Sequence, residues 1–256
     1  MGAYLTQLLA VADAELRKLR HDPWELASRA IQPVLWLLLF GNVMARVRGL
    51  APRTVPYLDF LAPGILAQSA LFVAIFYGIS AIWERDLGVL HRYLVSPAPR
   101  SALVAGKALS SGARALSQAL VVYLCAAALG VRLSLQPQDA AAAILLIALG
   151  ASLFSTFSLI IACIVRTRER FMGIGQVLTM PIFFASNAIY PVALMPAWLQ
   201  IVARLNPLTY EVDGLRGVML LDGASVYGLG RDFAVLALVA LLMIAVATRM
   251  YPRMTE

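Results

Sequence analysis

The chain reads FLAPGILAQSALFVAIFYGISAI over residues 60–82 and WERDLGVLHRYLVSPAPR over residues 83–100. The first stretch is apolar and long enough to cross a bilayer, for which a helix needs about 20 residues. The second stretch is charged and amphipathic, and a further long apolar run follows it. Because charged side chains are costly inside a bilayer, this order predicts a membrane helix, a segment at the aqueous surface and a second membrane helix.

The composition of the whole chain is typical of a membrane protein with several spans. Hydrophobic residues make up 61% of its 256 residues and charged residues only 14%, whereas a soluble domain carries about 25% charged residues. The formal charge of +7 comes from short basic clusters between apolar runs. That distribution indicates cytoplasmic loops and not a nucleic-acid-binding face. We therefore expect one all-α integral membrane domain over residues 1–256 and no nucleic-acid partner.

Six apolar segments are long enough to span a bilayer. They are residues 27–45, 60–82, 103–130, 140–165, 171–190 and 232–248. Lys and Arg are more frequent between these segments on the side of the N-terminus than on the opposite side. This bias predicts that both termini are cytoplasmic.

Two further regions are apolar but do not fit the pattern of a span. In residues 1–22 the apolar side chains fall on one helical face, which is typical of a helix lying in the membrane interface; a solvated leader helix is the alternative. Residues 191–231 contain prolines, a tryptophan and apolar runs too short to span. That composition predicts re-entrant or interfacial helices at the outer leaflet rather than an exposed loop.

The chain lacks the motifs of an ATPase, an ion-driven carrier and the common hydrolases. Gly106-Lys107 is not a Walker A loop, because the earlier glycine and the following Ser or Thr are missing. The middles of the six predicted spans contain no Asp, Glu or His, which ion-driven carriers use. His21 and His91 lie far apart in the sequence, and no HExxH, CxxC or GxSxG motif occurs. We therefore predict no catalytic residue, no metal site and no cofactor in this chain.

Residues 83–100 have the pattern of a docking helix. Leu87, Leu90 and Leu94 fall on one helical face with charged residues around them, and Pro97 and Pro99 follow. An apolar stripe flanked by charge is what a helix needs to bind in a groove of another protein. An ordinary solvated loop helix is the alternative.

This segment resembles the cytoplasmic loop of type-2 ATP-binding cassette (ABC) permeases. The resemblance lies in the acidic-basic pair Glu84-Arg85, then Gly88 and Leu90, then Ser96-Pro97. Residues 57–68, YLDFLAPGILAQ, resemble the start of the second span in the same family.

The late region from Pro191 to Arg216 also resembles this family, through Pro196 with Trp198, the sequence NPL at 206–208 and DGLR at 213–216. The ordered set of motifs is most similar to short bacterial permeases of the drug-resistance and nodulation-factor export type. One departure is NAIY at 187–190, where many relatives have Ser-Gly followed by Phe; it puts the geometry of that loop in doubt.

The resemblance implies six spans, an N-terminal interfacial helix, a cytoplasmic coupling helix over 83–100 and outer re-entrant helices between spans five and six. It implies a second permease copy, identical or related, and cytoplasmic ABC ATPase subunits that bind ATP and Mg. The residues implied for coupling to the ATPase are Glu84, Arg85, Asp86, Leu87, Gly88, Leu90, His91 and Arg92. Those implied for the outer re-entrant segment are Pro196, Trp198, Asn206, Pro207 and Arg216.

We therefore expect the permease subunit of an ATP-driven exporter in the bacterial inner membrane, surrounded by lipid and moving an amphipathic drug, lipid or glycoconjugate. The alternatives are an ion-gradient-driven secondary carrier and a non-transporting membrane scaffold. The substrate path implied by the resemblance lies between the paired permeases, along spans one, two and five. Candidate aromatic residues of a substrate cavity are Phe72, Phe76, Tyr77, Phe183 and Phe184, for which plain core or lipid-facing packing is the alternative.

Overall fold

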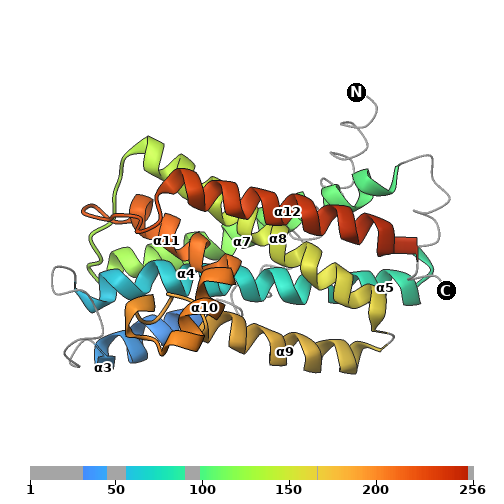
Figure 1. The fold of residues 1–256 in the computed structure, drawn as a ribbon, viewed down its shortest axis with the longest axis horizontal. Helices are drawn as coiled ribbons and strands as arrows, with labels where there is room; N and C mark the ends of the chain where they lie inside the picture. Colours follow the sequence, from blue (N-terminus) through green and yellow to red (C-terminus); the bar gives the residue numbers. More distant parts are fainter. Residues whose placement is uncertain (1–30, 45–55, 90–98, 166, 253–256) are drawn as a thin grey trace.

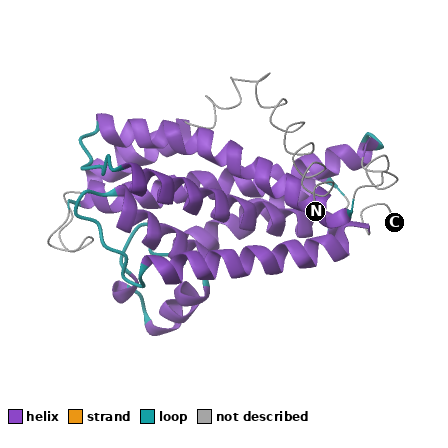
Figure 2. Cartoon of the chain, turned by 90° about the horizontal axis from the view of Figure 1, so that it is seen from above, coloured by secondary structure: helices purple, strands orange, loops and turns teal. Residues whose placement is uncertain are grey.

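The structure is a computed structural model that describes residues 31–44, 56–89, 99–165 and 167–252. Within these residues the regular elements are helices, most of which lie side by side along one long axis (Figure 1). Loops gather at the two ends of the bundle (Figure 2). The extended residues in the described ranges pair only in an isolated antiparallel bridge between Leu133 and Leu220. The prediction of an all-α protein is confirmed for these ranges, whereas the predicted interfacial helix over 1–22 lies outside them.

The first described helix, Ile31–Met44, falls within the predicted first span. It contains the π-helix η1 (Trp36–Gly41) and α3 (Asn42–Met44). Gly41 lets this helix approach α4 closely, where Leu58 and Leu61 are its nearest neighbours.

The central helix of the bundle is α4 (Tyr57–Tyr77), which α5 (Ile79–Asp86) continues after Gly78. Its residues are apolar on all sides, which is the pattern of a helix buried all round, and most of them are buried. A Cβ atom at Gly78 would overlap Oγ of Ser158 and press on the ring of Phe171. Oγ of Ser158 also donates to the carbonyl of Ile75. The joint between α4 and α5 is therefore held against α8 and α9.

Three long helices surround this centre: α7 (Arg100–Ala128), α8 (Pro137–Ile164) and α9 (Arg168–Phe184). Small residues at the contact let α7 and α8 approach closely, as is common between membrane helices. Ser111 of α7 donates to the carbonyl of Ala151 at 3.3 Å, and Ser152 of α8 donates to that of Ala108 at 3.1 Å.

The chain after α9 forms η2 (Val192–Leu194), α10 (Ala197–Leu205), α11 (Pro207–Met219) and α12 (Leu229–Met250). α11 packs against α4, α8 and α12, and nearly all its residues are buried. One side of α12 is apolar and exposed, as expected of a helix that faces lipid or another membrane helix.

Four helices among the described residues are long and apolar enough to cross a membrane: Tyr57–Asp86, Arg100–Ala128, Pro137–Ile164 and Leu229–Met250. The helix Ile31–Met44 and α9 are shorter. The predicted first span also includes residues 27–30 and 45, which are outside the described ranges. α9 ends at Phe184, although the predicted fifth span extends to Tyr190. The described residues thus give four clear spans of the six that we expected.

Candidate functional site

The predicted coupling segment begins at an exposed helix end. α5 stops after Asp86, and Gly88 then adopts a left-handed conformation (φ +69°) with open space around it. Such a glycine is a common way to end a helix. Leu87, beside it, is 71% exposed. Leu90, His91 and Arg92, which belong to the same prediction, lie outside the described residues.

Ion pairs tie this end of α5 to two neighbouring helices. Nζ of Lys107 in α7 lies 2.6 Å from Oε2 of Glu84, and both side chains are buried. The guanidinium of Arg168 in α9 donates to Oδ2 of Asp86 from Nη2 at 2.7 Å and from Nε at 3.1 Å. It also stacks on the indole of Trp83, 3.5 Å from the ring centroid. A movement of α5 therefore acts directly on α7 and α9.

Arg85 adds a contact with the end of α8. Its Nη1 donates to the carbonyl of Val165 at 3.5 Å, and its Nη2 lies 3.2 Å from Oδ1 of Asp86. Of the eight predicted coupling residues, the structure describes five; Glu84 pairs with Lys107, and Asp86 pairs with both Arg85 and Arg168.

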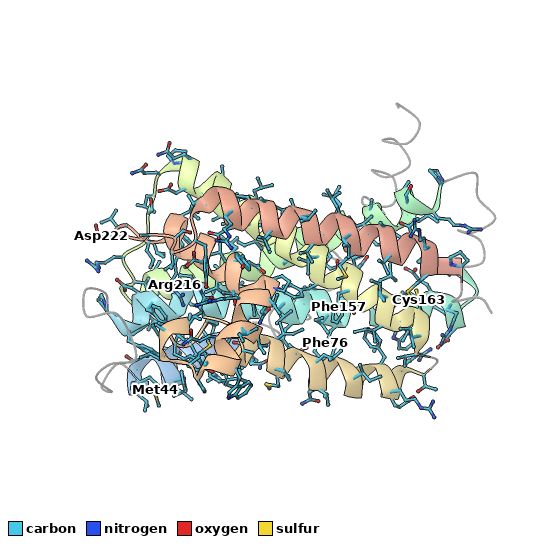
Figure 3. The ribbon with its side chains drawn as sticks, viewed as in Figure 1. Met44, Phe76, Phe157, Cys163, Arg216 and Asp222 are labelled. Atoms are coloured by element: carbon cyan, nitrogen blue, oxygen red, sulfur yellow. The ribbon has the colours of Figure 1, made fainter. Side chains whose placement is uncertain are left out.

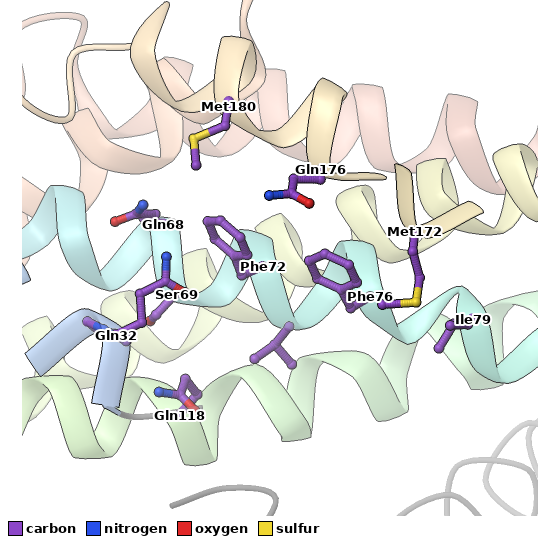
Figure 4. Close-up of a pocket in the computed structure, with 12 residues that line it drawn as sticks. Gln32, Gln68, Ser69, Phe72, Phe76, Ile79, Gln118, Met172, Gln176 and Met180 are labelled. Carbon is purple, nitrogen blue, oxygen red and sulfur yellow. The ribbon is translucent and has the colours of Figure 1, made fainter. Parts of the chain in front are cut away.

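A cavity of about 550 Å³ lies between the first helix, α4, α7 and α9 (Figure 4). In the ranges that the structure describes, its wall combines apolar side chains with four glutamines and a serine and has no charged residue. The lining residues are Gln32, Pro33, Gln68, Ser69, Phe72, Val73, Phe76, Ile79, Gln118, Met172, Gln176 and Met180. The volume is in the range of small-molecule sites.

Two of the five aromatic residues proposed for a cavity lie in this wall. Phe72 and Phe76 are stacked on α4 with their ring centroids 6.1 Å apart. Tyr77 instead turns to α7, where its hydroxyl lies 3.0 Å from Oγ of Ser110. Phe183 is fully buried, and Phe184 lies beside it, away from the lining. Figure 3 shows Phe76 between the bundle end that holds Cys163 and the end that holds Arg216.

At the other end of the bundle, Asn206 joins α9 to α11. Its side-chain oxygen accepts from the backbone N–H of Leu208 at 3.0 Å, so it caps α11. Its Nδ2 donates to the carbonyls of Ile182 and Ala185, at 2.6 and 2.9 Å, which helix α9 leaves free as it ends. Pro207 occupies the first helical position of α11, where its missing N–H costs nothing.

Arg216 fixes the loop after α9 to α4. It donates to the carbonyl of Phe60 at 3.2 Å and to those of Asn187 and Ala188. Its guanidinium stacks on the ring of Phe60, 3.7 Å from the centroid. Asn187 and Ala188, in the stretch whose sequence departs from the expected pattern, are thus held by Arg216 through their backbone carbonyls.

Pro196 and Trp198 lie at the start of α10. Pro196 is the N-cap residue of this helix, and Trp198 projects outward with Ile201 and Leu205 as a row of exposed apolar side chains. An amphipathic helix with an exposed tryptophan is typical of the membrane–water interface.

Buried carboxyl groups cluster around α11. Glu211 is fully buried, and a Cβ atom at Gly150 of α8 would overlap its carboxyl group. Neither of its oxygens has a hydrogen-bond partner within the described residues. Burial raises the pKa of the Glu211 carboxyl well above its ordinary value, because desolvation disfavours the charged form.

Asp213 and Asp232 share one serine. Oγ of Ser225 lies 2.8 Å from Oδ2 of each, and it also accepts from the N–H of Gly228 at 2.7 Å. A hydroxyl has a single proton, so Oγ of Ser225 donates to one of the two aspartates at a time. Oδ2 of Asp213 also accepts the N–H of Tyr227 at 2.9 Å. Among the described residues, the side chain of Asp213 thus has two donors and that of Asp232 has one.

The family described as ABC-2 type transporter matches residues 6–220 of the chain. The protein belongs to the ABC-2 type transporter family. This confirms the resemblance found in the sequence, and it identifies a transport permease of the membrane.

In residues 31–44, 56–89, 99–165 and 167–252, no three His, Cys, Asp or Glu side chains are grouped closely enough to hold a metal ion.

Three similar proteins cover most of this chain. A protein named as a transport permease, ycf38, of Cyanophora paradoxa is 30% identical over 83% of this chain and 74% of its own length. The daunorubicin resistance ABC transporter permease protein DrrB1 of Streptomyces coeruleorubidus is 25% identical over 78% of this chain and 70% of its own. Nodulation protein J of Rhizobium leguminosarum bv. trifolii is 27% identical over 76% of this chain and 74% of its own.

Several residues that build the sites of this ABC-2 permease were not singled out from the sequence. Lys107 and Arg168 form the ion pairs of α5, and Gln68 and Gln118 line the cavity. The sequence feature that could have identified these residues is a polar side chain within an otherwise apolar helix. Such a side chain needs a hydrogen-bond partner when it is buried. Glu211 was not singled out because Asp213, two residues later, faces a different side of a helix, so the two carboxylates do not form an acid/base pair; the structure buries Glu211 in α11.

Proposed function

We propose that this ABC-2 permease is the membrane subunit of an ATP-driven exporter for an amphipathic drug, lipid or glycoconjugate. Two permease copies, identical or related, would work with two cytoplasmic ABC ATPase subunits, which bind ATP and Mg. The observation that carries the proposal is that the exposed end of α5 is tied by ion pairs to α7 and α9. These two helices and α4, which α5 continues, all supply side chains to the cavity wall.

In the proposed mechanism, the ATPase pushes on α5 at Leu87. The push reaches α9 through Asp86 and Arg168, and it reaches α7 through Glu84 and Lys107. Rigid helices joined by such contacts move as units, so the cavity walls shift relative to one another. α5 continues α4 through Gly78, a position that packs against Ser158 of α8, so a push on α5 is also passed to α4.

The contact between Asp86 and Arg168 also supports the proposed orientation. The segments around both residues are basic and were predicted to be cytoplasmic from their Lys and Arg content. In the structure they lie at the same end of the bundle and touch. That end is the one on which we propose the ATPase binds.

A second permease copy would complete the cavity. The first described helix and α9 both border the cavity and expose apolar side chains, among them Ile31, Leu39 and Val177. Exposed apolar faces of this kind suit contact with lipid or with another membrane helix.

Site-specific crosslinking tests the docking of the ATPase. Cys125 and Cys163 are replaced by alanine, and Leu87→Cys is introduced as the single cysteine. The chain is co-expressed with its ABC ATPase, and a photoactivatable maleimide is attached to this cysteine. We expect capture of the ATPase from Leu87→Cys and not from the matched control Leu135→Cys, a residue that is 85% exposed in the loop between α7 and α8. Equal capture from both positions, or none from Leu87→Cys in a folded complex, would contradict the proposal.

One observation favours the ion-gradient-driven carrier as a second candidate, namely the buried and unpartnered carboxyl of Glu211. Intramembrane carboxyls often carry protons in transporters. The carrier predicts transport by the permease alone in proteoliposomes under a proton gradient, and its loss in Glu211→Gln. The ATP-driven exporter predicts no transport in that condition.

A further inference from the structure

The cavity contains two amide side chains that lack protein partners. Gln68 of α4 is 3% exposed and Gln118 of α7 is 1% exposed. Nε2 of Gln68 and both polar atoms of Gln118 have no hydrogen-bond partner in the part of the chain that the structure describes. Buried polar groups in proteins are nearly always satisfied. Figure 4 shows Gln68 and Gln176 of α9 beside Phe72, and Gln118 on α7, across the view from them. A ligand in the cavity is the natural partner for these amides.

The described part of the wall favours an uncharged head group. None of the lining residues within the described ranges carries a charge, and an ion placed against them would lose its hydration without gaining a counter-ion. The nearest cation along α7 is Arg114, one turn from Gln118. Its guanidinium stacks on the ring of Tyr77, 5.2 Å from the centroid, and it is not part of the lining.

The remaining wall suits a ring with both polar and apolar surfaces. A carboxamide both donates and accepts, as a hydroxyl does, so glutamines match a head group that has several hydroxyls. The stacked rings of Phe72 and Phe76 offer flat apolar faces, and Met172 and Met180 offer adaptable ones.

We propose that the cavity binds an uncharged, hydroxyl-rich head group, such as a glycoside, that is attached to an apolar tail. The proposal rests on the proposed function, because it names the class of substrate that the permease would move. Gln68 and Gln118 hydrogen-bond the hydroxyls, Phe72 and Phe76 pack on the ring, and the tail extends toward the exposed apolar face of the first helix.

The test uses labelling at the cavity wall and needs no ATPase. The full chain, with its two native cysteines replaced by alanine, carries Met172→Cys and is reconstituted in nanodiscs, where the rate of maleimide labelling is measured. The probes are dodecyl maltoside, dodecyl phosphocholine, dodecyl sulfate and dodecyltrimethylammonium at the same mole fraction. Val177→Cys, which is exposed on α9 outside the lining, reports any general effect of the amphiphile on labelling.

We expect dodecyl maltoside alone to slow labelling of Met172→Cys, with no effect at Val177→Cys. Gln68→Leu or Gln118→Leu should each raise the maltoside concentration for half-protection about fivefold, as expected for the loss of one hydrogen bond. These variants should fold, because leucine replaces an unpartnered buried amide, and thermal unfolding checks this. Gln68→Asn or Gln118→Asn should each keep part of the protection that dodecyl maltoside gives to Met172→Cys.

Equal protection by the charged probes, no protection by the maltoside, or full protection in Gln68→Leu/Gln118→Leu would overturn the proposal. ATP-driven transport of another amphiphile by the permease–ATPase complex, measured separately, would then show that the proposed function stands although the head-group assignment fails.

Discussion

Nζ of Lys107 and Oε2 of Glu84 lie 2.6 Å apart, and both side chains are buried between α5 and α7. A buried ion pair of this kind is strongly destabilised when one partner is removed, because the other charge is left uncompensated. The pair therefore fixes α5, the element on which we propose the ATPase acts, to a helix that lines the cavity.

Lys107→Met should lower the free energy of unfolding by about 3–5 kcal/mol. Thermal unfolding of the purified chain measures the loss. The control is Glu84→Leu/Lys107→Met, in which no charge is left buried and most of the stability should return. A double variant no more stable than Lys107→Met would show that the pair does not act as a unit.

Asp86 and Arg168 should matter for coupling more than for stability. Their side chains are partly exposed, and exposed pairs contribute about 0–1 kcal/mol. Arg168→Ala should leave the thermal unfolding midpoint nearly unchanged but weaken the stimulation of ATP hydrolysis by transported amphiphile in the permease–ATPase complex.

The charge-reversed pair Asp86→Arg/Arg168→Asp should restore part of that stimulation. Full stimulation in Arg168→Ala, with normal assembly of the complex, would be evidence against the link between α5 and α9.

Gly150 should be required because Glu211 occupies the space beside it. Gly150→Ala would place a Cβ atom against the carboxyl group of Glu211, and overpacking of this kind costs about 1–3 kcal/mol. Glu211→Ala in the same chain should relieve the overlap. Gly173→Ala is the matched control, since nothing lies within 4 Å of that position, and it should be neutral or stabilising in thermal unfolding. Equal losses at Gly150 and Gly173 would refute the packing explanation.

The shared serine predicts an asymmetry between two aspartates. Asp232→Asn keeps a side-chain oxygen that accepts from Oγ of Ser225 and should cost little stability. Asp213→Asn weakens an acceptor of both Ser225 and the N–H of Tyr227, and it should cost more, about 1–3 kcal/mol. Thermal unfolding of the two variants side by side decides the point, and the reverse order would contradict this explanation.

The spans were predictable because their signal is local. A long apolar run must form a helix in a bilayer. The charged residues after residue 82 predicted a surface segment between two such helices, and the exposed end of α5 lies there in the structure. The pairing of Glu84 with Lys107 was not predictable in the same way. It joins residues that are far apart in the sequence, and it depends on how α5 and α7 lie against each other.

The end of α9 was missed for a related reason. The predicted fifth span continued through residues 185–190, but Nδ2 of Asn206, in a later segment, donates to the carbonyls of Ile182 and Ala185, where α9 ends. Likewise, residues 191–231 predicted short re-entrant or interfacial helices and did not indicate how deeply α11 is buried. Arg216 is buried because three backbone carbonyls and the ring of Phe60 replace water around it.

The most direct test of the account follows the cavity wall while the ATPase works. Maleimide labelling of Met172→Cys in proteoliposomes is measured for the permease alone, with ATP, with its ATPase, and with ATPase and ATP-Mg together. We predict a changed rate only when both ATPase and ATP-Mg are present. A change without the ATPase, or an unchanged rate while the assembled complex hydrolyses ATP, would contradict the claim that a partner drives this permease through α5.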